Sequence, residues 1–169
     1  MGNRSIQNHP YAVAKATWHD KSHDAPDAFE TFVAISVTLT GFSNAELQST
    51  GLMRGWFDDL ALIMGRPIRD ACLAAIAVDP AAALTRQPFA PLARNLIRMW
   101  YVGQWKALPA NWAHANFDAD AARQFNEFGR DADRVISPAG YVEGLAWRAI
   151  GINPPGAKQP GFASWTKAL

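Results

Sequence analysis

The segment 88–105, PFAPLARNLIRMWYVGQW, carries the strongest helical pattern in the chain. Leu92, Leu96 and then either Met99 or Trp100 recur at spacings of three or four residues, so an α-helix would place them on one face. Gly103 follows at the next such spacing. Because a helix of this kind buries its apolar face against other elements, the pattern favours a fold built from packed helices.

Further segments combine helical spacing of apolar residues with residues that begin or end helices. The clearest start is SNAE, where Ser43 and Glu46 are three residues apart and form a capping-box pattern. The β-branched run 33–40 also suits a strand, but Asp27 as a start and Gly41 as a stop favour a helix there. The predicted helical segments are 27–41, 43–65, 66–78, 88–105, 118–129 and 137–150. Gly51 and Gly55 weaken the middle of the segment 43–65, where they indicate either a kink or the close approach of another backbone. DRVIS, residues 133–137, is the one short stretch that suits a strand.

These segments predict an all-α protein with about five or six helices in a single compact domain. A chain of 169 residues is most simply one domain, and 49% hydrophobic residues suffice for its core. We expect the helical domain to span residues 27–150. Residues 1–26 are expected to form an irregular polar arm. Residues 151–169 are expected to form an extended Pro- and Gly-rich tail, because the prolines there forbid regular structure.

Composition and charge exclude several classes of function. The net charge is +1 and the basic residues are scattered, so the basic stripe of a nucleic-acid-binding protein is absent. The longest apolar run, residues 73–78, is far shorter than the ~20 residues that span a membrane. Cys72 is the only cysteine, which excludes an internal disulfide, a zinc–cysteine cluster and an iron–sulfur centre. We therefore expect no nucleic-acid partner and no transmembrane segment, and a buried thiol at Cys72.

Residues with catalytic or metal-binding chemistry are few and scattered. His19 and His23 are four residues apart and could ligate a metal on a helix, but no third ligand lies nearby in the sequence. A site assembled from His114, Asp118 and Glu143 is the alternative for a small helical enzyme. The sequence contains no Gly-x-Gly-x-x-Gly loop, phosphate loop or Gly-x-Ser-x-Gly motif. It therefore predicts no catalytic, cofactor or metal site in this chain.

Aromatic residues are concentrated near residue 100 and again near the C-terminus. Neighbouring residues on a helix point about a quarter-turn apart, so one face cannot bury Trp100, Tyr101 and Trp105 together. Large aromatic residues are enriched at the hot spots of protein interfaces. The predicted anchors of a partner interface are Tyr101, Trp105, Tyr141, Trp147, Phe162 and Trp165. Two alternatives to a partner interface stay open. The aromatic residues could form a tryptophan-rich core with the tail folded over it, or a homo-oligomer could bury the same aromatic residues between its copies.

Several segments of the chain resemble those of a known family. FVAISVTLTGF, residues 32–42, resembles the first characteristic segment of the small subunit of membrane-bound FAD-dependent sugar and polyol dehydrogenases. WYVGQW, residues 100–105, is similar to that family's Trp-Tyr-x-Gly element, and YVEGLAW, residues 141–147, is similar to its Tyr-x-x-Ala-Leu helix. The Pro- and Gly-rich ending with a late Trp resembles the family's last segment. The family includes the small subunits of sorbitol, fructose and bacterial glucose dehydrogenase complexes.

The resemblance implies a helical, non-catalytic subunit without a cofactor of its own. Such subunits wrap a larger FAD-dependent flavoprotein of the glucose–methanol–choline type, which oxidises a sugar, a polyol or another alcohol, and they are needed for its maturation. In many members the small subunit carries a twin-arginine export signal for both chains. A cytochrome c subunit often completes the electron path to quinone. The resemblance thus implies a periplasmic location. The tail, residues 151–169, is expected to dock on the large subunit, because proline-fixed extended segments lose little entropy when they dock and Phe162 and Trp165 can serve as anchors at its end.

The chain departs from the family pattern in two places. Its N-terminal stretch MGNRSIQNHP lacks the apolar core of an intact signal peptide, so a cytoplasmic location stays open. Some members have a cysteine in the last segment that can bond to the large subunit, but this chain reads NPPGAKQPG there. A covalent link cannot form at that point, and we expect the contact with the large subunit to be non-covalent.

Overall fold

The computed structural model describes residues 27–154, and these are mostly helical, which confirms the predicted all-α class. The expected arm, residues 1–26, lies outside the described residues, as does the expected tail beyond residue 154. The helices are α1 (Ala28–Thr40), α2 (Asn44–Ser49), α3 (Met53–Met64), α4 (Arg66–Ala77), α5 (Pro80–Ala83), α6 (Ala90–Val102), α7 (Trp112–Asn116), α8 (Ala119–Phe128), α9 (Pro138–Glu143) and α10 (Leu145–Ala149). The strands of this part are β1 (Gln104–Trp105) and β2 (Arg134–Val135).

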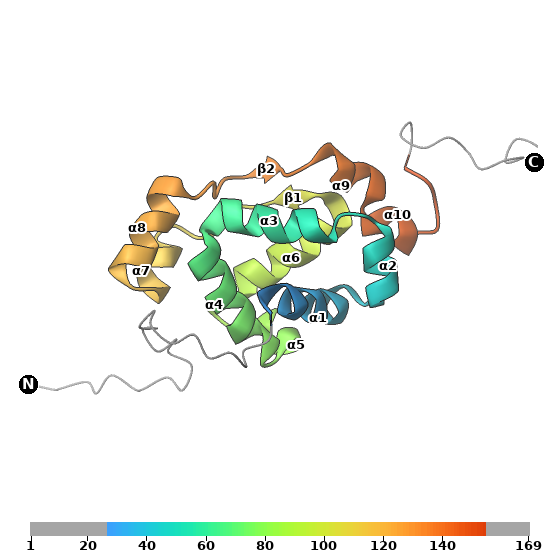
Figure 1. Ribbon diagram of the computed structural model, residues 1–169. Coiled ribbons are helices and arrows are strands. Elements are labelled where there is room, and N and C mark those ends of the chain that lie inside the picture. Colours follow the sequence, from blue (N-terminus) through green and yellow to red (C-terminus); the bar gives the residue numbers. More distant parts are fainter. Residues whose placement is uncertain (1–26, 155–169) are drawn as a thin grey trace, which may run out of the picture.

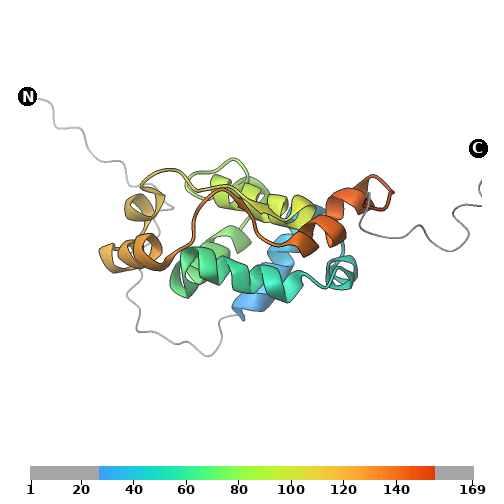
Figure 2. The same cartoon turned by 90° about the horizontal axis from the view of Figure 1, so that it is seen from above.

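The longer helices pack against one another in the middle of the molecule, and short helices close its two ends (Figure 1). Helix α1 packs against both α4 and α6, and α3 packs against α4. Figure 2 shows the same arrangement from above, with α7 and α8 at one end and α9 and α10 at the other. None of the helices within residues 27–154 combines the length and the apolar content that a membrane span requires.

Helix α6 confirms most of the helix predicted over residues 88–105. Its buried residues include Leu92, Leu96, Met99 and Trp100. The helix ends at Val102 because Gly103 adopts a φ of 63°, the left-handed conformation typical of a helix end. The prediction that the helix continues through Trp105 is therefore wrong. The next two residues form β1, which pairs antiparallel with β2, so the strand predicted in DRVIS is confirmed.

Two segments that were predicted as single helices are each divided in two. Segment 43–65 forms α2 and α3, and the break lies at Gly51, which has a φ of 71°. The capping box at the start of α2 is confirmed, because the Ser43 and Glu46 side chains each bond to the other's backbone N–H. Segment 137–150 forms α9 and α10, with Gly144 between them. These breaks, together with the short helices α5 and α7, divide the fold into more helical segments than the five or six expected.

Two glycines allow α9 to cross the end of α6 at close range. A Cβ atom on Gly140 would lie 2.6 Å from the Cα of Gly103 and 2.8 Å from the ring of Trp56. A Cβ atom on Gly103 would lie 2.7 Å from the Cα of Gly140. Larger side chains would clash at these separations, so the crossing depends on glycine at both positions. The crossing brings α9 and α10 into contact with α6 and seats the C-terminal helices on the core.

Candidate partner-contact surface

Exposed apolar side chains gather at the end of the molecule that α9 and α10 form. Tyr141 of α9 is 46% exposed, and Ile150 and Ile152, which follow α10, are 63% and 51% exposed. Trp147 of α10 is half-buried. We call these four residues the α9–α10 surface. Large apolar residues exposed together are typical of surfaces that bind other proteins.

The two aromatic rings of this surface are held together. The rings of Tyr141 and Trp147 pack edge to face, with centroids 5.2 Å apart and an interplanar angle of 80°. The Nε1–H of Trp147 donates a hydrogen bond to the carbonyl oxygen of Tyr141. This bond satisfies the polar atom of the indole within the chain, so a partner needs to offer only apolar contacts to the ring. The pair is thus preorganised, which lowers the entropy cost of binding.

Arg148 ties α10 to the neighbouring helix α2. One guanidinium nitrogen lies 2.6 Å from the Oγ of Ser49 and 3.3 Å from the carbonyl oxygen of Glu46. The cation therefore lies near the C-terminal end of α2, where the helix dipole favours positive charge. The backbone N–H of Ile152 also donates to the carbonyl oxygen of Trp147 at 3.0 Å, which holds the chain directly after α10. The α9–α10 surface is consequently fixed to the rest of the fold.

The two anchors predicted near residue 100 lie in different surroundings. Tyr101 is half-buried, and its hydroxyl donates to the carbonyl oxygen of Thr40 at 3.0 Å. Trp105 is 2% exposed, and its Nε1–H donates to Oδ1 of Asp131 at 2.7 Å. The expectation that Trp105 is an outward-facing anchor is therefore corrected, since it is a core side chain. Trp105 lies in β1, beyond the end of α6. The argument that one helix face cannot bury it together with Trp100 and Tyr101 therefore does not apply to it.

The segments 32–42 and 100–105, which carry part of the family resemblance, meet in the core. The Nε1–H of Trp100 donates to the Oγ of Ser36 at 3.0 Å, and both side chains are almost fully buried. The Ser36 hydroxyl in turn donates to the carbonyl oxygen of Phe32 at 2.7 Å. These bonds set the pairing of α1 with α6. Ser36 and Trp100 thus have a structural role in this chain.

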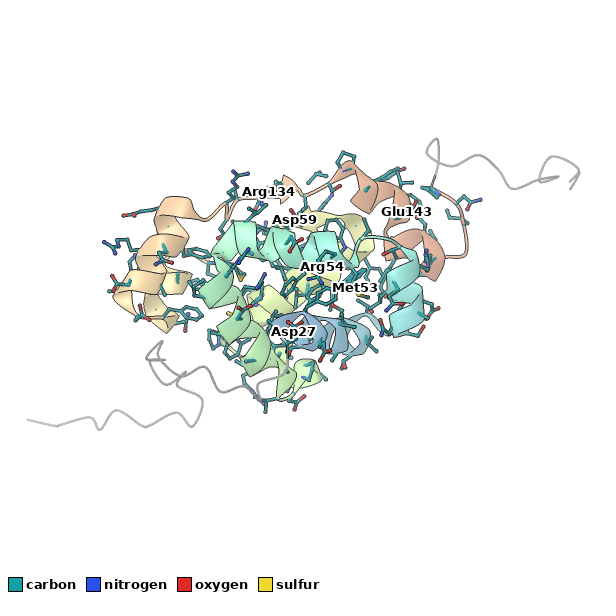
Figure 3. All side chains as sticks on the ribbon, in the orientation of Figure 1. Asp27, Met53, Arg54, Asp59, Arg134 and Glu143 are labelled. Carbon is teal, nitrogen blue, oxygen red and sulfur yellow. The ribbon has the colours of Figure 1, made fainter. Side chains whose placement is uncertain are left out.

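The residues of the enzyme alternative do not form one site. His114 Nε2 lies 2.8 Å from Nδ2 of Asn126, and Asp118 caps α8 by accepting a hydrogen bond from the backbone N–H of Ala121. Glu143 belongs to α9, at the opposite end of the molecule from α7 and α8 (Figures 1 and 3). Among residues 27–154, no cluster of three or more His, Cys, Asp or Glu side chains could hold a metal ion. Four residues singled out in the sequence, His19, His23, Phe162 and Trp165, lie outside the described residues.

Burial raises the pKa of two groups in the described part of the chain above their ordinary values. The thiol of Cys72 is fully buried, as predicted, and burial raises its pKa, so the thiol is protonated and unreactive at neutral pH. Burial also raises the pKa of the Asp59 carboxyl above its ordinary value, although the charge of Arg134 acts in the opposite direction (Figure 3). Neither group lies in the α9–α10 surface.

Ile150 and Ile152 were not among the predicted anchors, because the prediction considered only aromatic residues. They flank Gly151, which has a φ of 71° and lies just beyond the end of α10. A pair of large aliphatic residues around a glycine, directly after a predicted helix, is the sequence signal that could have identified them.

Comparisons of the chain with protein-family models, curated proteins and solved structures find no match. The function proposed for the chain therefore rests on its own surface chemistry and on the sequence resemblance.

Proposed function

We propose that this protein is the non-catalytic small subunit of a heteromeric FAD-dependent dehydrogenase of the glucose–methanol–choline type. In this proposal the large subunit holds FAD and oxidises a sugar, a polyol or another alcohol. The small subunit has no cofactor, stabilises the large one and assists its maturation and its export to the periplasm. Complexes of this family often include a cytochrome c subunit, which would accept the electrons where it is present.

The α9–α10 surface is the single observation that most supports a partner-binding role. It combines a preorganised aromatic pair, Tyr141 and Trp147, with two isoleucines that are more than half exposed. Tyr and Trp, together with Arg, are enriched at interface hot spots, particularly where the surrounding contacts exclude water. Such a surface gains free energy when it is covered, since each square ångström of apolar surface removed from water contributes about 25 cal/mol.

The position of this surface in the chain also supports the proposal. Residues 155–169 continue directly from it and include Phe162 and Trp165, the two remaining predicted anchors. An interface that joins the α9–α10 surface to this tail would be continuous along the chain. Obligate complexes of this kind typically bury ~2,000 Å² or more. Removing every residue after Gly151 is therefore expected to abolish co-purification with the large subunit.

A substitution on the α9–α10 surface tests the proposal without shortening the chain. Ile150→Asp places a charge at a position that is 63% exposed, so the fold should tolerate it. If Ile150 lies in the interface, the charge loses its water on binding, and the Kd for the large subunit should rise roughly 30-fold, as for a hot-spot residue. Val78→Asp is the matched control, because Val78 is 78% exposed and lies at the end of α4. Equal Kd values for the two variants would exclude the α9–α10 surface as the contact.

The homo-oligomer alternative uses the same exposed surface and makes a different prediction. Light scattering on the isolated chain should then show a stable dimer, and Ile150→Asp should convert it to a monomer. The small-subunit proposal instead predicts that the isolated chain forms no such dimer. A dimer that Ile150→Asp dissociates would therefore contradict the proposal.

A further inference from the structure

An open groove of about 630 Å³ runs along α1, on a part of the molecule separate from the α9–α10 surface. Its apolar lining includes Phe29, Val33 and Val37 from α1 and Met53 from the start of α3. Gln48 of α2 lies at its edge and is exposed. Figure 3 labels Asp27, the residue directly before α1, and Met53, the first residue of α3, which both line this groove. The groove is thus a largely apolar surface formed by three helices.

Helix α1 has apolar residues on more than one face. Phe32 and Ile35 point into the core and are almost fully buried. Val33 and Val37, which line the groove, are only half-buried. A helix that is apolar around much of its circumference is normally covered by neighbouring elements on all those sides. We therefore expect another segment to cover the groove face of α1, and within residues 27–154 no segment covers it.

We propose that residues 11–18 of this same chain, YAVAKATW, occupy the groove. The described part of the chain begins at Asp27, and Asp27 itself lines the groove, so residues 1–26 join the fold there. Within that N-terminal stretch, residues 11–18 contain Tyr11, Val13 and Trp18 as large apolar side chains. The inference does not depend on the flavoprotein partner, because the docking segment and the groove belong to the same chain.

The length of the intervening chain is sufficient for this contact. From Asp27 to Val37 the groove follows α1 for about 15 Å, at about 1.5 Å per residue. Residues 19–26 can extend over ~26 Å at about 3.3 Å per residue, so they can reach any point along it. The chain must reverse its direction once before Asp27. The sequence Asp24-Ala25-Pro26 suits such a reversal, since Asp and Pro are typical turn residues.

The charges of the two surfaces are complementary. Asp27 and Glu30 place two carboxylates in the groove lining. Arg54 is the neighbouring cation, and its guanidinium lies 3.8 Å over the ring of Phe29. Residues 11–18 carry one charge, that of Lys15, and no acidic residue. A segment with apolar anchors and a single cation therefore fits a lining with apolar residues and two carboxylates better than an acidic partner would.

Cross-linking in the full chain tests the contact. Thr17→Cys combined with Gln48→Cys places one thiol on the segment and one at the groove edge, and a short bismaleimide then joins them. Thr17→Cys combined with Val135→Cys is the control pair, since Val135 is 61% exposed in β2, far from α1 (Figure 1). The native Cys72 is fully buried and should not react. Docking raises the effective concentration of the two thiols, so the groove pair should cross-link at least ~10-fold faster than the control pair.

Two matched alanine-to-aspartate variants show whether docking in the groove causes the faster cross-linking. Ala34→Asp adds a charge to an exposed residue of the groove lining, and it should remove the rate advantage of the groove pair. Ala74→Asp makes the same change at an exposed residue of α4 and should leave the advantage intact. Equal rates for the two cysteine pairs, an advantage that survives Ala34→Asp, or cross-links that form only between two chains would each overturn the proposal.

Discussion

Replacing Ser36 with alanine removes the hydrogen-bond acceptor of a buried indole. Trp100 is 1% exposed, and its Nε1–H donates to the Oγ of Ser36 at 3.0 Å. After the replacement this donor is buried without an acceptor, which costs about 1–3 kcal/mol. Alanine has a higher helix propensity than serine, and that gain of about 0.5 kcal/mol offsets part of the loss. We therefore expect Ser36→Ala to lower the free energy of unfolding by about 0.5–2.5 kcal/mol.

Thr38→Ala is the matched control for this prediction. Thr38 lies on the same helix, and its hydroxyl donates to the carbonyl oxygen of Ala34 as the Ser36 hydroxyl does to Phe32, but it is exposed and has no indole partner. Its replacement should change stability by no more than about 0.5 kcal/mol. Urea denaturation followed by circular dichroism gives both values, and a loss of 1 kcal/mol in a chain of this length lowers Tm by roughly 2–4 °C. Equal stabilities for the two variants would refute the structural role of the Ser36–Trp100 bond.

Two further predictions concern the glycine crossing and the partly buried carboxylate. Gly140→Ala should destabilise the fold by about 1–3 kcal/mol, because its Cβ would lie 2.6 Å from the Cα of Gly103. Gly55→Ala should instead stabilise the fold by about 0.5–1 kcal/mol, because its Cβ in α3 would meet no atom within 4 Å other than those of its chain neighbours and its own helix backbone. Thermal unfolding compares them, and equal Tm shifts would contradict the clash. Burial raises the pKa of Asp59 above that of the unfolded chain, so its ionised form destabilises the fold at neutral pH, and this penalty fades as the pH falls below the unfolded-state pKa. Asp59→Asn should consequently stabilise the protein at pH 7 and have little effect near pH 3, while an equal effect at both would show that the charge is not responsible.

Local patterns in the sequence predicted the features that depend on neighbouring residues. The spacing of apolar residues identified α6, and the Ser43–Glu46 pair identified the start of α2, since both signals act within one or two helical turns. The burial of Trp105 depends instead on Asp131, which lies 26 residues later in the chain and accepts its Nε1–H. No periodic pattern contains that information.

Only part of the candidate surface could be predicted, because local patterns identify its aromatic residues but not their exposure. Tyr141 and Trp147 are six residues apart, so the segment that contains both could be identified as one aromatic cluster. Their exposure depends on how α10 lies against α2, which the bond from Arg148 to Ser49 fixes across 99 residues of sequence. The break at Gly144 also depends on distant contact, because a Cβ there would lie 2.6 Å from the carbonyl oxygen of Tyr101.

The most direct test of the proposed function is to isolate the protein from its native cells under conditions that preserve complexes. The proposal predicts that a larger flavoprotein co-purifies in a fixed ratio, with flavin absorbance that substrate sugars or alcohols bleach. Ile150→Asp should reduce the amount recovered, and Val78→Asp should not. Recovery of the chain alone and without flavin, from cells that express both partners, would contradict the proposal that it is a dehydrogenase small subunit.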